Sequence, residues 1–200
     1  MISQHILEKL FDSHIKIRLF KLFLRNPDES FSYAQAHDKL LIKTNEEREF
    51  KKELQKLRDI EFVLEKKKST KKDGESVYSL NPSFTFLNEL KNLVLRSSPV
   101  DQQKLAEKIH NLGKVRLAVL SGVFMGARSS TSIRTDILVV SDVISERRFT
   151  TFIKTVEAEV GVDIKYTLLS TEEYEYRVKM FDRFLRDIFE RPHVILIGKQ

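Results

Sequence analysis

The chain has 200 residues, of which 41% are hydrophobic and 32% are charged, and its formal net charge is +6. This balance is typical of a globular protein and not of a disordered or fibrous one. The absence of cysteine excludes disulfides, thiolate zinc sites and cysteine nucleophiles. No apolar run approaches the roughly 20 residues that span a bilayer, and the start lacks a secretion-signal pattern. We therefore expect a cytoplasmic protein with no membrane partner.

Helical patterns come first along the chain. A broadly apolar helix over residues 15–24 ends at Asn26 and Pro27, because proline cannot continue a helix. A second helix is expected over residues 32–40. A third is expected over residues 46–60, where apolar residues recur at helical spacing.

After these three helices, the spacing of the apolar residues changes from a helical to a strand-like period. Two short strand-like runs, over residues 62–68 and 75–80, flank Asp73 and Gly74, which favour a hairpin turn. Three helices followed by a hairpin is the order of a winged helix-turn-helix. An amphipathic stretch from Phe84 to Leu95 closes this half, and its apolar stripe is either a dimer interface or part of the core.

The second half alternates helices and strands, which predicts a mixed α/β domain packed on one sheet. In chain order we expect a helix over 101–112, strands over 115–120 and 136–140, a helix over 146–160, a strand over 162–169, a helical region over 171–191 and a strand over 193–197. Ser97, Ser98 and Pro99 interrupt the pattern before this half. The expected fold class is therefore α+β, with domains over 1–98 and 101–200.

The third helix is the candidate DNA-reading helix, since the second helix of a helix-turn-helix lies in the major groove. Its face away from the core carries residue types that suit base readout, although any solvated helix has a charged outer face. The candidate DNA contacts on this face are Asn45, Arg48, Lys52, Gln55 and Lys56.

The predicted hairpin carries five lysines within seven residues, namely Lys66, Lys67, Lys68, Lys71 and Lys72. Lysines at a hairpin tip can contact phosphates and so position a protein on DNA. They also keep an edge hairpin from aggregating, and that alternative stays open.

The run "TSIRTDILVV", over residues 131–140, places Arg134 and Asp136 on one face of an expected strand, because side chains alternate across strands. Two carboxylates at this spacing hold the divalent cations of nucleotidyl transfer. Asp163, in a later strand, is a candidate third acid.

At these residues the second half resembles a minimal nucleotidyltransferase-like domain. Gly122 and Gly126 in "LSGVFMGARSS" are similar to its loop, and "RTDILVV" is similar to its acid-bearing strand, with Asp136 at the second acid and Arg134 at the first. The chain from "DIKYTLLSTEEYEYRVKMFDRF" to its end, and "KIRLFKLFLRNPDESFSYAQ" and "ELQKLRDIEFVLEKKK" in the first half, resemble bacterial winged-helix transcriptional regulators fused to such a domain.

The resemblance covers almost the whole chain and implies a DNA-binding regulator whose nucleotidyltransferase-like domain is inactive. A guanidinium cannot ligate a metal, so Arg134 removes one ligand and leaves Asp136 and Asp163 as vestigial candidates. We expect no metal, no cofactor and a homodimer on double-stranded DNA. A nucleotide effector held by Gly122, Gly126, Arg128 and Arg134 is a further possibility.

Two alternatives compete with the regulator. One is an active metal-dependent nucleotidyltransferase that uses Asp136 and Asp163. The other is a protein-interaction module in which Glu46, Glu49 and Glu53, on one flank of the third helix, bind a basic partner. Separately, the aromatic residues Phe181, Phe184 and Phe189 lie at roughly helical spacing, and we expect them in the core.

Overall fold

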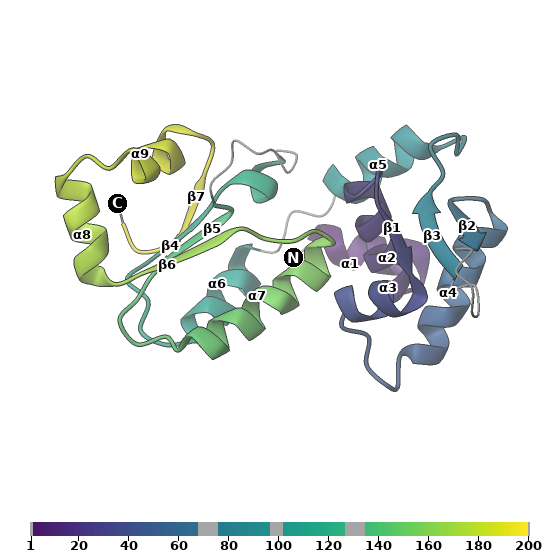
Figure 1. The fold of residues 1–200 in the computed structure, drawn as a ribbon, viewed down its shortest axis with the longest axis horizontal. Helices are drawn as coiled ribbons and strands as arrows, with labels where there is room; N and C mark the ends of the chain where they lie inside the picture. The colour runs from purple at the N-terminus through teal and green to yellow at the C-terminus, as the bar shows by residue number, and fades with distance from the viewer. Residues whose placement is uncertain (1, 68–75, 97–101, 127–134, 200) are drawn as a thin grey trace. The chain divides into compact units, whose positions relative to one another are not determined.

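The computed structural model describes residues 2–67, 76–96, 102–126 and 135–199. The chain divides into two compact units: residues 1–99 with 157–162, and residues 100–156 with 163–200. Both units combine helices with one small sheet (Figure 1), so the fold is mixed α and β. Among the described helices, none has the length and apolar character needed to cross a membrane.

The first unit has the expected three helices and hairpin, with additional elements around them. In chain order it contains α1 (Ile2–Phe11), α2 (His14–Arg25), β1 (Ser30–Ser32), α3 (Tyr33–Lys39), α4 (Glu47–Asp59), β2 (Val63–Lys67), β3 (Ser76–Leu80) and α5 (Leu87–Arg96). The sheet has the order β1-β3-β2, with antiparallel pairs throughout. Neither α1 nor the three-residue β1 was expected from the sequence.

Local signals fix the ends of these helices. Ser13 caps α2 by accepting a hydrogen bond from the backbone N–H of Lys16 at 3.1 Å. Ser32 and Gln35 form a capping box at the start of α3, which satisfies two donors that the first helical turn leaves free. Helix α2 ends at Arg25, with Asn26 as its C-cap, as the sequence predicts.

An aromatic core holds the first unit together. Phe23, Phe50 and Phe62 are fully buried, and Phe62 makes edge contacts with Phe20 and Phe84, at ring-centroid distances of 4.9 and 5.4 Å. Such T-shaped pairs add about 0.5–1.5 kcal/mol each beyond the area that they bury. The core therefore fixes α2, α4 and the hairpin relative to one another.

Helix α5, the candidate dimer interface, turns most of its apolar stripe inward. Val94 is fully buried, and Leu87 and Leu90 pack against the core of the first unit. Phe86, just before the helix, and Leu93 remain 64% and 40% exposed. The stripe is therefore mainly core, and only these two side chains of the stretch are large, apolar and exposed.

The second unit is built on a four-stranded sheet with the order β6-β5-β4-β7. Its elements are α6 (Gln102–His110), β4 (Leu117–Leu120), a short 3-10 helix (Gly122–Met125), β5 (Ile137–Val140), α7 (Glu146–Val160), β6 (Tyr166–Leu169), α8 (Thr171–Lys179), α9 (Arg183–Glu190) and β7 (Val194–Ile197). Strands β5 and β6 are parallel, and β4 is antiparallel to both β5 and β7.

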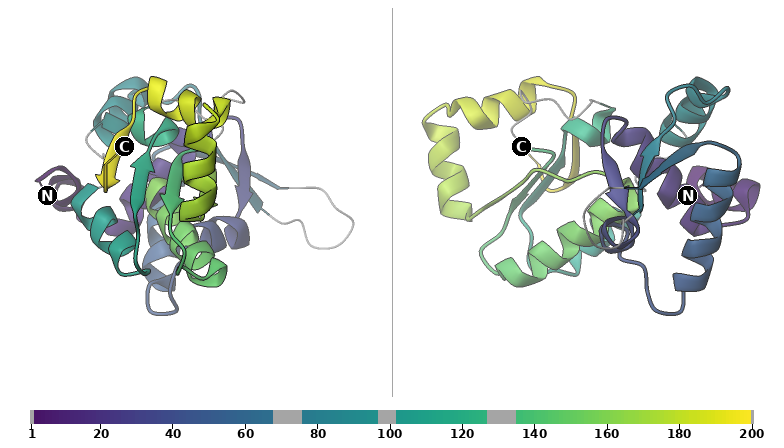
Figure 2. Two further views of the ribbon diagram at one scale, coloured as in Figure 1. Left: turned by 90° about the vertical axis from the view of Figure 1, so that its left-hand side faces the viewer. Right: turned by 45° about the vertical axis from the view of Figure 1, so that its right-hand side comes forward.

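Helices cover both faces of this sheet. Helices α6 and α7 lie on one face and α8 and α9 on the other (Figure 1, Figure 2). Every residue of the central strands β4 and β5 is consequently buried, which explains why these two runs are continuously apolar. The helical region expected over 171–191 is two helices, because Asp182 caps the start of α9 by accepting from the N–H groups of Phe184 and Leu185.

Candidate nucleic-acid interface and the acid-bearing strand

The orientation of α4 is set by its apolar side chains. Phe50, Leu54 and Leu57 are buried in the core of the first unit, and they recur at helical spacing, so the opposite side of the helix faces solvent. The five DNA contacts predicted for the third helix are all exposed, namely Asn45, Arg48, Lys52, Gln55 and Lys56. We call this set the outer face of α4.

Two cations of the outer face are uncommitted. Within the described part of the chain, Arg48 and Lys52 take part in no ion pair. Gln55 donates a hydrogen bond to the carboxylate of Asp59 at 2.8 Å, a solvent-exposed bond that is easily exchanged. Arg48 and Lys52 are therefore the side chains most ready to meet an anion.

Lys56 differs from this pattern because it already has a partner. Its Nζ lies 2.6 Å from Oε1 of Glu53, although its side chain is 47% exposed. A lysine that already neutralises a carboxylate contributes less positive potential to the surface. Lys56 is thus a partner of Glu53 first and a weaker candidate for contact with DNA.

One acid of the flank beside α4, Glu53, turns inward. The Glu53 side chain is only 5% exposed, and its Oε2 lies 3.2 Å from Nζ of Lys16 in α2. Burial raises the pKa of the Glu53 carboxyl, but the two lysines together outweigh that effect, so its pKa lies below the usual value. A buried carboxylate with two lysine partners is not available to a basic protein.

The other two acids of the flank also have partners within the first unit. The hydroxyl of Ser13 donates to Oε1 of Glu49 at 2.7 Å, which joins the start of α2 to α4. Oε2 of Glu46 accepts from the backbone N–H of Lys43 at 3.0 Å. These contacts weaken the reading of the flank as a docking surface.

The hairpin carries part of the predicted basic cluster. Lys66 and Lys67 are exposed at the end of β2, whereas Lys68, Lys71 and Lys72 lie outside the described residues. The ion pair of Arg58 with Glu65, at 2.8 Å, ties the hairpin to the end of α4. The two elements therefore present their basic side chains from one connected framework.

Asp136, which directly precedes β5, is buried, and both of its carboxylate oxygens accept hydrogen bonds. Its side chain is 6% exposed. Oδ1 accepts from the backbone N–H of Val123 at 2.8 Å, and Oδ2 accepts from that of Lys165 at 3.0 Å. Val123 follows β4 and Lys165 precedes β6, so one carboxylate joins three neighbouring strands at their ends.

The remaining predicted residues of this site are only partly described. In residues 2–67, 76–96, 102–126 and 135–199, no group of three or more acids and histidines is placed to hold a metal. Asp163 is exposed. Arg128 and Arg134 lie outside the described residues.

The two loop glycines have a backbone role. Gly122 and Gly126 adopt φ values of +54° and +79°, in the left-handed region that favours glycine. Gly126 ends the 3-10 helix, with its N–H bonded to carbonyls of Gly122 and Val123. The glycine pattern is thus accounted for by the turn, whether or not a nucleotide binds there.

One feature was missed from the sequence. Phe181 was expected in the core with Phe184 and Phe189, but its side chain is 87% exposed, whereas the other two pack against the sheet. Phe181 sits at the break between α8 and α9, beside a hollow. The visible signal was Asp182, whose type favours the start of a new helix.

Comparisons with known proteins return no relative. No family model matches the chain, and neither a curated protein nor a solved structure is significantly similar to it.

Proposed function

We propose that the chain is a cytoplasmic DNA-binding transcriptional regulator. Its first unit acts as a winged helix-turn-helix, and its second as a catalytically degenerate nucleotidyltransferase-like domain that serves assembly or sensing. The observation that carries the proposal is the charge distribution around α4: Glu46, Glu49 and Glu53 each have a partner within the first unit, whereas Arg48 and Lys52 are exposed and form no ion pair with any described residue.

The order of elements supports this assignment. Helix α2, strand β1, helices α3 and α4 and the hairpin β2–β3 follow one another as in a winged helix. Helix α4 takes the position of the recognition helix in the major groove. Residues 40–46 connect α3 to α4, so Asn45 stands at the N-terminal end, where recognition helices contact bases.

The side chains of the outer face match the two kinds of contact that DNA offers. Arg48 suits the O6 and N7 acceptors of guanine, and Asn45 or Gln55 suits the edge of adenine. Lys52 and the hairpin residues Lys66 and Lys67 would contact phosphates, which fixes position without reading sequence. Gln55 would exchange its bond to Asp59 for one to a base.

A homodimer completes the proposal, because a two-fold arrangement matches palindromic half-sites. Phe86 and Leu93, the exposed apolar residues of the α5 region, are our candidates for the contact. The second unit is proposed to be inactive because Asp136 already accepts two backbone hydrogen bonds and Arg134 occupies the place of its partner acid.

The test is selection of binding sites from random duplex DNA, followed by affinity measurement on the selected site and on single-base variants. Arg48→Ala/Gln55→Ala is expected to lose about 1–3 kcal/mol of discrimination for each base contact removed. Arg147→Ala is the matched control, because Arg147 is an exposed arginine of the second unit. Failure of the wild type to enrich any sequence or to bind duplex DNA would contradict the proposal.

A further inference from the structure

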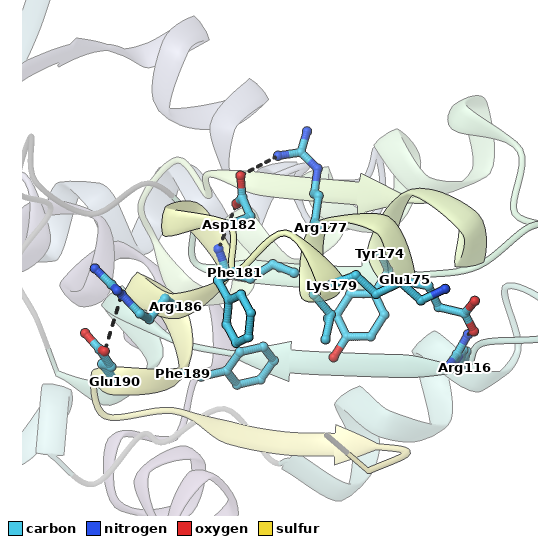
Figure 3. A pocket seen from close by; sticks show the side chains of 12 residues that line it. Arg116, Tyr174, Glu175, Arg177, Lys179, Phe181, Asp182, Arg186, Phe189 and Glu190 are labelled. Atoms are coloured by element: carbon cyan, nitrogen blue, oxygen red, sulfur yellow. Dashed lines mark hydrogen bonds and ion pairs between the residues drawn. The ribbon is translucent and has the colours of Figure 1, made fainter.

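A hollow of about 530 Å³ lies between α8, α9 and the start of β4. Its volume is within the range of roughly 300–1,000 Å³ that is common for small-molecule sites. Tyr174, Phe181 and Phe189 point their rings into it (Figure 3), and Leu185 forms part of its wall. All of these residues belong to the second unit.

The charges around this hollow largely cancel. Each carboxylate of the wall pairs with an arginine of the wall: Arg116 with Glu175 at 2.6 Å, Arg177 with Asp182 at 3.6 Å, and Arg186 with Glu190 at 3.5 Å. Because these charges are paired, burial of the apolar rings is the main contribution to ligand binding that the hollow offers.

Lys179 is the exception to this pairing. Within the described residues it forms no ion pair, and it influences the pKa of Glu175 only at longer range. Lys179 is therefore the one cation of the wall that no carboxylate of the described residues pairs with. A ligand with one negative charge would find its partner there.

The exposure of Phe181 is a second observation. Its φ of +51° is the left-handed conformation that the residue after a helix end commonly takes, and Asp12, Leu41 and Glu61 take it after other helices of this chain. The helix end therefore places the residue, and it leaves a phenylalanine 87% exposed at the hollow. An apolar ligand that covered this ring would bury its surface.

We propose that this hollow binds a small aromatic anion. The flat body of the ligand packs among Tyr174, Phe181 and Phe189, where offset or edge-on ring contacts are favourable. Its single anionic group lies near Lys179. The site belongs to the second unit alone, so the proposal stands or falls separately from DNA binding.

The experiment uses the full-length protein and two matched probes, 2-naphthoate and the neutral 2-naphthamide, titrated by calorimetry. We expect saturable binding of one naphthoate per chain and at least tenfold weaker binding of naphthamide, since about 1.4 kcal/mol from one charged contact gives that factor. Lys179→Gln is expected to remove the difference between the probes. Phe181→Ala is expected to weaken both by roughly tenfold.

Two control variants separate the site from general surface effects. Tyr176→Ala removes an aromatic ring of α8 that is 63% exposed and lies outside the hollow, and Lys154→Gln removes an exposed lysine of α7. Both should bind naphthoate as the wild type does. No saturable binding, equal affinity for the two probes, or binding unaffected by Phe181→Ala would each overturn the proposal. It would also be overturned if Phe181→Ala instead abolished self-association in sedimentation while naphthoate failed to bind.

Discussion

Helices α4 and α8 are both rich in charge, but they place it in opposite ways. In α4 the carboxylate of Glu53 is buried beside Lys16, and the exposed cations Arg48 and Lys52 form no ion pair within the part of the chain that the structure describes. In α8 the arginine Arg177 is held by Glu173, at 2.8 Å, and by Asp182, and an aromatic ring is exposed at the helix end.

This difference in ion pairing determines which kind of ligand each helix favours. Uncommitted cations on a solvated face create a positive potential that draws polyanions. Paired charges contribute little net potential, so the hollow beside α8 attracts a ligand mainly through apolar area. On our proposals, these two charge-rich helices would therefore suit two different kinds of ligand, and the difference follows from their ion pairs.

The largest expected effect comes from a residue that neither helix contains. Asp136→Ala leaves the N–H groups of Val123 and Lys165 without their acceptor, which should destabilise the second unit by about 2–4 kcal/mol. Asp136→Asn, which retains one acceptor, should lose less. Urea denaturation followed by circular dichroism measures both, and hydrogen exchange of the two amides locates the effect.

The contrary outcome for Asp136 is specific. If Asp136→Ala kept the wild-type stability but abolished a Mg²⁺-dependent transfer of labelled nucleotide, the carboxylate would be catalytic. The contrast between a structural acid here and binding surfaces on α4 and α8 would then be wrong.

An intermediate effect on the free energy of unfolding is expected at Glu53, and this effect depends on pH. Because the folded state lowers the pKa of Glu53 below 4.5, its stabilisation is fully present above that pH and is lost as the pH falls through the lowered pKa. Glu53→Gln should cost about 1 kcal/mol at neutral pH, since Lys56 can return to solvent. The variant should also lose less of its free energy of unfolding than the wild type does as the pH falls.

The measurement for Glu53 is urea denaturation of the wild type and variant between pH 3 and 7. Glu47→Gln, which changes an exposed acid of the same helix, is the control and should track the wild type. A Glu53→Gln profile parallel to that of the wild type would show that the ion pairs do not orient α4.

The smallest effect is expected at Phe181. Phe181→Gly should stabilise the chain by about 0.5–1 kcal/mol, because glycine relieves the left-handed conformation at the cost of a more flexible unfolded state. Phe181→Ala should not stabilise it, since alanine keeps the strain. Thermal denaturation compares the two, and a destabilised Phe181→Gly would show that the exposed ring supports the fold.

Much of the fold follows from apolar patterning in the sequence. Phe50, Leu54 and Leu57 predict which side of α4 faces solvent, and the structure confirms this. Helix α7 has the predicted bounds, Glu146 to Val160. Patterning succeeds here because burial on one side imposes a period that short segments carry on their own.

The parts that were missed depend on partners distant in the sequence. The ion pair between Glu53 and Lys16 requires α2 to pack against α4, and Asp136 finds its two partners 13 and 29 residues away. Strand β1 has only three residues, too few for an alternation to be visible. The hollow forms where the chain breaks between α8 and α9. The sequence does not show this break, because Phe181, Phe184 and Phe189 keep a helical spacing across it.

The most direct test of the central claim is the salt dependence of binding to duplex DNA. If the outer face of α4 and the hairpin contact phosphates, log affinity should fall steeply with log salt, and Lys52→Ala and Lys66→Ala/Lys67→Ala should each flatten the slope by roughly one unit per lysine. Lys154→Ala should leave the slope unchanged. No binding by the wild type at about 50 mM salt, where electrostatic affinity is strong, or the same slope in every variant, would contradict the account.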